Sequence, residues 1–209
     1  MAYTAITLDP ATKPRVRGLI QRVEDHYLRD VHAMLRLPVP GSEITAGCNF
    51  AIAQVLLAIV SGVSVTLYEH SGGKGGRFKQ LLVDYYPWSE EPVPVHDREE
   101  TAAMIYSLVR NPLTHDLGVD LETKHRTRSV TVKRLTTDHE TCGHTEAGVE
   151  ALEIDARPVS LSPTMTVEAD RVVLLVEAFY WGIRRMLQKL SADSARVATA
   201  EQFLESLEH

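Results

Sequence analysis

Apolar residues recur at helical spacing along most of this chain. Over residues 14–37 they form one continuous stripe with charged residues on the opposite side, and Pro14 stands where a helix start tolerates proline. Residues 44–68 carry no charge, which predicts a second helix over 42–68, N-capped by Ser42 and covered by neighbours on nearly all sides. A glycine-rich connector at 71–76 and a short helix over 77–86 follow.

Two further helices are predicted in the second half of the chain. Asp97 and Glu100 form a capping-box pattern, and the helix that they start should end near Arg110, because Pro112 restricts the residue before it. The last long helix is predicted over 166–191, apolar enough to be central or to form an interface. Between them, residues 121–161 lose the helical period. Strand-like runs at 129–132 and 159–161, and less clearly at 151–154, predict a small β arm or hairpin there.

The expected fold class is therefore mainly α. We expect one domain over residues 1–206, a bundle of four to five helices with a small β arm or hairpin inserted before the last long helix. Residues 207–209 read Leu-Glu-His, which resembles the start of an expression tag, and they are left out of the functional argument.

Composition narrows the cellular setting. The net charge of −6 argues against a broadly basic nucleic-acid-binding surface, although a local basic patch is compatible with it. Cys48 and Cys142 lie far apart and residues 1–10 lack a signal-peptide pattern, so a cytoplasmic location is expected. The uncharged run at 44–68 raises the alternative of a membrane-spanning helix. Its polar residues and the weak flanking charge favour a bundle helix, and no membrane partner is expected.

The candidate chemistry lies in the six residues Arg110-Asn111-Pro112-Leu113-Thr114-His115. Arg-x4-His by itself is common in a chain of this composition, and a second copy ends at His139. Requiring Asn directly after the Arg lowers the chance expectation to roughly one in a hundred, and only the first copy meets it at the end of an amphipathic helix. The segment brings together a permanent cation, an amide and a titratable imidazole.

This segment, with a helix before it and long apolar helices on either side, resembles the R-x4–6-H signature of the HEPN superfamily. The resemblance implies a bundle of about four helices that forms a homodimer, with a composite site where the motifs of two subunits meet. Many members are metal-independent endoribonucleases of toxin, anti-phage or RNA-processing systems, and others only bind RNA, nucleotides or partners. The arm at 121–161 is longer than a minimal member needs.

The residue types suit RNA cleavage, because RNA carries its own nucleophile in the 2′-hydroxyl. His115 can move protons near neutral pH, Arg110 can bind two phosphoryl oxygens, and Asn111 can orient the phosphate or the imidazole. An acid and a base are both needed, so two copies of His115 in a symmetric dimer are expected. Basic residues after the motif form a weaker RNA-binding candidate: Lys124, Arg126, Arg128, Lys133 and Arg134.

Several alternatives stay open. The chain could be a HEPN-like module without catalysis that binds RNA, a nucleotide or a partner such as an antitoxin or regulator, or an unrelated helical protein. No cofactor and no metal are expected, although His139, Cys142 and His144 have spacing that a zinc ion could use. The Gly-Lys pair at Gly73-Lys74 lacks the Ser or Thr that a P-loop places next, since Gly75 stands there.

Overall fold

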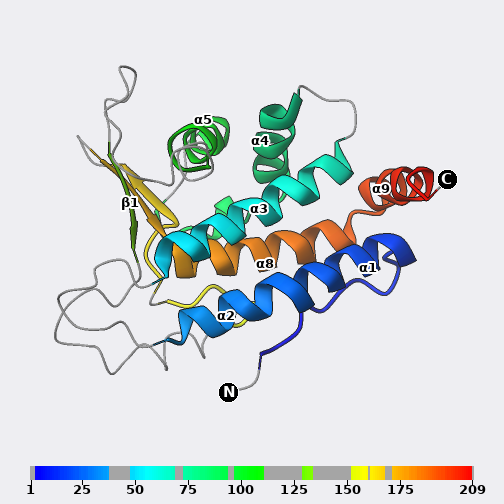
Figure 1. Ribbon diagram of the computed structural model, residues 1–209, viewed down its shortest axis with the longest axis horizontal. Coiled ribbons are helices and arrows are strands. Elements are labelled where there is room, and N and C mark those ends of the chain that lie inside the picture. Colours follow the sequence, from blue (N-terminus) through cyan, green and yellow to red (C-terminus); the bar gives the residue numbers. More distant parts are fainter. Residues whose placement is uncertain are drawn as a thin grey trace.

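Three long helical segments run alongside one another through the molecule (Figure 1). The computed structural model describes residues 3–37, 48–68, 73–93, 97–110, 129–133, 152–159, 161–167 and 171–208. The three segments are α1 (Pro14–Val23) continued by η1 (Glu24–Leu28) and α2 (Arg29–Leu35), then α3 (Asn49–Leu67), and α8 (Val176–Ala192). The prediction of a helix over 14–37 is confirmed. The part of the second predicted helix before Cys48, including Ser42, lies outside the described residues.

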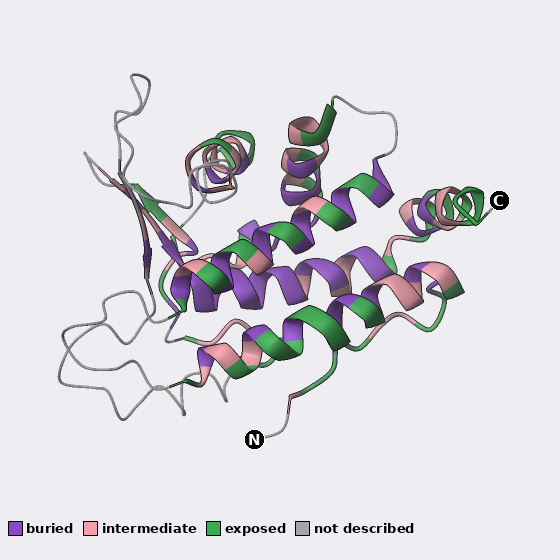
Figure 2. Ribbon diagram, in the orientation of Figure 1, coloured by how far each residue is buried: buried purple, intermediate pink, exposed green. Residues whose placement is uncertain are grey.

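The core is organised around α8, which lies between α3 and the α1–α2 segment and is buried over most of its length (Figure 2). Phe179, Tyr180 and Trp181 have no solvent-exposed surface. Of the two roles predicted for the last long helix, the structure shows the central one, but the predicted start is wrong: the helix begins at Val176, about ten residues later than expected.

A three-stranded sheet stands at one end of the helices (Figure 1). Its order is β1 (Ser129–Lys133), β3 (Arg171–Leu175) and β2 (Met165–Val167), with β3 parallel to β1 and antiparallel to β2. The strand at 129–132 is confirmed. The strands predicted at 151–154 and 159–161 are wrong where described, because the hairpin is formed by β2 and β3 instead. Val172 and Val173, predicted as helical, favour the strand, and β1 pairs with them.

One helix packs on α3 on the side away from α1, a second packs on that helix, and a third packs at the far end (Figure 1). These are α4 (Gly73–Tyr85), α5 (Arg98–Met104) continued by η3 (Ile105–Arg110), and α9 (Ser194–Ser206). The glycine-rich connector is wrong from Gly73 onward, because α4 begins there and buries Phe78, Leu81 and Leu82. Sequence reasoning also missed α9, which Asp193 caps by accepting a hydrogen bond from the Arg196 amide (3.0 Å). A short 3-10 turn, η2 (Trp88–Glu90), follows α4.

The apolar helix α3 is the one described helix long and apolar enough to cross a membrane by length and composition. Half of its most apolar stretch is buried within the molecule, and α3 packs against α2, α4, α8 and α9. Packing inside a bundle accounts for the buried half of this stretch.

The segment before α1 is tied to α8 by buried polar groups. Arg184, 1% exposed, donates to the carbonyl oxygens of Leu152 (3.0 Å) and Thr4, and its guanidinium lies 4.9 Å from the centre of the Tyr3 ring. Glu24, 5% exposed, accepts from Tyr3 Oη (2.9 Å) and from the amide of Ile6 (2.7 Å). These contacts satisfy polar groups that would otherwise be costly to bury.

His32 makes the same region sensitive to pH. Its ring lies 5.6 Å from that of Tyr3 and 6.2 Å from that of Tyr180. Burial lowers the pKa of His32 below its usual 6.5, and the positive charges of Arg184 and Arg36 lower it further. Below pH 6.5 the unfolded chain therefore binds more protons than the folded protein, so stability falls as the pH drops from there through the lowered pKa.

We expect His32→Gln to flatten this part of the stability profile, measured by urea unfolding at a series of pH values below and above 6.5. His26→Gln, on the exposed side of the same helical segment, is the matched control and should leave the slope unchanged. A slope that survives His32→Gln would assign the acid sensitivity to other groups.

Candidate functional site

Arg110 is the last residue of a helix whose start is well defined. Asp97 Oδ1 accepts from the Glu100 amide (2.8 Å), which confirms the predicted N-cap, and the Thr101 hydroxyl donates to the Asp97 carbonyl oxygen (2.8 Å). The buried stripe of Ala102, Ile105 and Val109 then holds the helix against the bundle.

The last six residues of this helix, η3, form a π-helix. A π-helix has about one more residue per turn than an α-helix, and short π-helical segments are frequent at functional sites. Arg110, at the end of η3, is partly buried. The motif is thus preceded by a helix of unusual geometry.

An aromatic ring supports the Arg110 side chain. The guanidinium carbon lies 5.6 Å from the centre of the Tyr106 ring, within the range of a cation–π contact. Tyr106 in turn packs against Phe78 of α4, with ring centres 5.3 Å apart. The cation therefore lies against an aromatic ring of η3 that itself packs on α4.

Gly75 makes this approach of α4 to η3 achievable. A Cβ atom at Gly75 would lie 2.8–2.9 Å from the end of the Tyr106 ring, closer than side-chain carbons are found. The glycine therefore has a role in close packing of α4 on η3, within a helix rather than in a loop of the P-loop kind.

The surroundings of α5 carry mixed charge. A groove of about 640 Å³ between α4 and α5 is lined by Lys79 and by the carboxylates of Asp97, Glu99 and Glu100. Three carboxylates against one ammonium group disfavour a phosphate backbone in that groove.

The described residues include one of the three predicted catalytic residues. Arg110 stands at the end of η3 as described above, whereas Asn111 and His115 lie outside the described residues. So do Lys124, Arg126, Arg128 and Arg134 of the weaker RNA-binding set, and of Lys133 only the backbone is described, on β1. The zinc-compatible residues His139, Cys142 and His144 lie outside them as well.

Sequence reasoning missed Tyr106 and Gly75. Tyr106 had a local signal, because an aromatic residue four positions before an Arg on a helix can contact it. Gly75 had none, because its role depends on a helix more than twenty residues further along the chain.

The described part of the chain contains no group of three or more His, Cys, Asp and Glu side chains placed to hold a metal ion. Comparison of the chain with protein families, with curated proteins and with solved structures finds no match.

Proposed function

We propose that this protein is a HEPN-like, metal-independent endoribonuclease that acts as a homodimer, with Arg110, Asn111 and His115 in its site. The observation that supports the proposal most strongly is the position of Arg110. It closes a capped amphipathic helix, is partly exposed, and is held against Tyr106. A cation held in this way can bind phosphoryl oxygens without losing much side-chain freedom.

The proposed reaction needs only proton transfers and charge stabilisation. His115 of one subunit takes the proton from the 2′-hydroxyl, whose oxygen attacks the adjacent phosphorus. The bond from phosphorus to the 5′-oxygen breaks, and His115 of the partner subunit protonates that leaving oxygen. Arg110 stabilises the charge that builds on the phosphoryl oxygens. The products are a 2′,3′-cyclic phosphate and a 5′-hydroxyl end.

The test is cleavage of a mixed RNA pool in the presence of EDTA, with analysis of the new ends. Wild type should give cyclic-phosphate ends, and His115→Ala and Arg110→Ala should each lower the rate by about 100-fold or more. Size-exclusion chromatography with light scattering should show a dimer at the concentration of the assay. Cleavage by His115→Ala at the wild-type rate would overturn the proposal.

Gly75→Ala tests the same site from the side of α4. The added methyl group should push the Tyr106 ring away from Arg110 and lower cleavage, while thermal unfolding stays near wild type because the ring end can move. Gly62→Ala on α3, where a Cβ meets nothing within 4 Å, is the matched control and should cleave normally. RNA binding without cleavage by every variant would support the non-catalytic binding module instead.

A further inference from the structure

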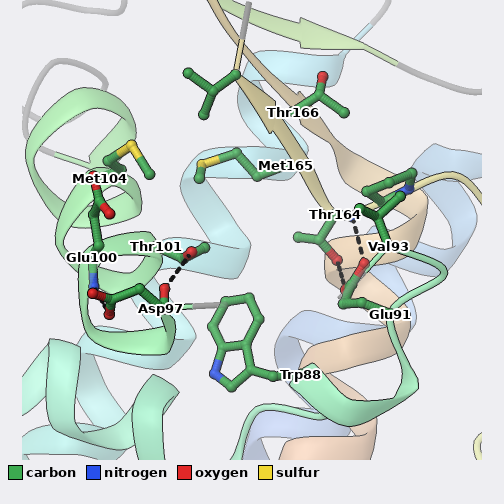
Figure 3. A pocket seen from close by; sticks show the side chains of 12 residues that line it. Trp88, Glu91, Val93, Asp97, Glu100, Thr101, Met104, Thr164, Met165 and Thr166 are labelled. Carbon is green, nitrogen blue, oxygen red and sulfur yellow. Dashed lines mark hydrogen bonds between the residues drawn. The ribbon is translucent and has the colours of Figure 1, made fainter. Parts of the chain in front are cut away.

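A second pocket, of about 520 Å³, lies between α5 and strand β2 (Figure 3). Its apolar lining includes Trp88, Met104 and Met165, which belong to three different elements. Trp88 is held firmly, because its indole N–H donates to the Leu82 carbonyl oxygen (2.7 Å) and its ring centre lies 4.4 Å from that of Tyr86. The pocket is therefore of a size that suits a ligand, and the Trp88 side chain gives it a fixed apolar surface.

One wall of the pocket is the edge of the sheet. The strand order β1-β3-β2 leaves β2 at the edge among the described strands, and residues 163–167 line the pocket consecutively. Alternate residues of a strand point to opposite faces, so a pocket that contacts consecutive residues borders the edge of the strand rather than one face.

The backbone register shows which groups this edge presents. The Leu175 amide donates to the Thr164 carbonyl oxygen (2.9 Å), and Met165 and Val167 lie opposite Leu174 and Val172. Because directly opposed residues of an antiparallel pair alternate between bonded and non-bonded, the N–H and C=O groups of Met165 and Val167 point away from β3. An added strand could pair with these groups.

The charges around the pocket are of one sign. Asp97 and Glu100 are exposed on the α5 side, across the pocket from β2 (Figure 3). Glu91, whose side chain is 2% exposed, is already neutralised by Arg157 (3.3 Å) and accepts from the Thr164 hydroxyl (2.7 Å). The described lining includes no Lys or Arg. A cationic ligand is therefore favoured over a polyanion such as RNA.

We propose that this groove binds an extended, basic segment of a partner protein. The segment pairs with the outer edge of β2 as an added strand. One Lys or Arg side chain lies against Asp97 and Glu100, and a neighbouring apolar side chain packs on Trp88, Met104 and Met165. Backbone pairing provides affinity and the acidic rim selects the charge. The proposal is independent of the proposed ribonuclease site.

The probe is a capped peptide of alternating Lys and Val, titrated into the full chain by calorimetry. Wild type should bind it in a saturable one-to-one complex and should not bind the matched Glu-Val peptide. A Lys-Val peptide N-methylated along one edge should also fail, because it cannot pair with β2. Equal binding of the N-methylated peptide, or no saturable binding by wild type, would overturn the proposal.

Two charge reversals on neighbouring residues distinguish binding in the groove from a general effect of surface charge. Glu100→Lys should weaken binding by about tenfold or more, whereas Glu99→Lys, which makes the same change of net charge but does not line the pocket, should have a much smaller effect. If both substitutions weaken peptide binding equally, the effect comes from net charge alone, and the proposed site is overturned. If single-stranded RNA competes with the peptide, the ligand of the groove is RNA and not a partner protein. If the chain self-associates and Glu100→Lys abolishes that association, the ligand is a second copy of this chain.

Discussion

Gly182→Ala is expected to lower the free energy of unfolding by about 3 kcal/mol, at the upper end of the usual cost of overpacking a core. Gly182 lies in the middle of α8, and a Cβ atom there would collide with the Oη and Cζ atoms of Tyr86. Tyr86 cannot move aside, because its hydroxyl is hydrogen-bonded to that of Thr164 (2.6 Å) and its ring is enclosed between Trp88 and Phe179.

Gly62→Ala provides the matched comparison for that prediction. Gly62 also lies within a long helix, but on an exposed position where a Cβ meets no atom within 4 Å. The substitution should raise stability by up to about 1 kcal/mol through helix propensity alone. Urea unfolding of both variants measures the difference, and a Gly182→Ala variant as stable as Gly62→Ala would contradict the packing of Tyr86 on α8.

Glu24→Ala should destabilise the protein by about 4 kcal/mol, since it removes a charged, buried hydrogen-bond acceptor. The substitution leaves the Tyr3 hydroxyl and the Ile6 amide without their acceptor. It also removes a negative charge that acts on the same phenol as the buried Arg184: burial raises the pKa of Tyr180, Arg184 lowers it and Glu24 raises it.

Two further variants separate hydrogen bonding from charge at Glu24. Glu24→Gln keeps an acceptor for Tyr3 and Ile6, so it should lose less stability than Glu24→Ala if hydrogen bonding dominates. Asp25→Ala removes an exposed carboxylate whose pair with Arg29 (3.2 Å) is solvent-accessible, and it should cost less than about 1 kcal/mol. Equal effects of Glu24→Ala and Asp25→Ala would show that the segment around Tyr3 is not docked in solution.

Local signals determined which helices could be predicted from the sequence. Pro14 starts α1 and Asp97 caps α5, and each acts through residues within one turn of itself. Strand β3 gave no such signal. Its residues Val172 and Leu175 continue the apolar spacing of α8, whereas in the structure β3 pairs with β2 on one side and on the other with β1, which lies about forty residues earlier in the chain.

The candidate sites also differ in how far they could be predicted from local signals in the sequence. The motif at Arg110 is contiguous and could be found by inspection, and Tyr106 lies one turn before it. Gly75 and the groove beside β2 depend on contacts between elements that are distant in the chain, as Trp88, Met104 and Met165 illustrate. Spacing within a sequence carries no signal for such a juxtaposition.

The docking of the first segment on the last helices has a consequence for synthesis of the chain. The Thr12 hydroxyl donates to the Ser191 carbonyl oxygen (3.0 Å), and Glu201 of α9 accepts from the Arg15 and Val16 amides (3.0 and 3.1 Å). During synthesis, the apolar face of α1 therefore lacks these partners until α8 and α9 have been translated. Until then the nascent chain exposes this apolar face to water and to chaperones.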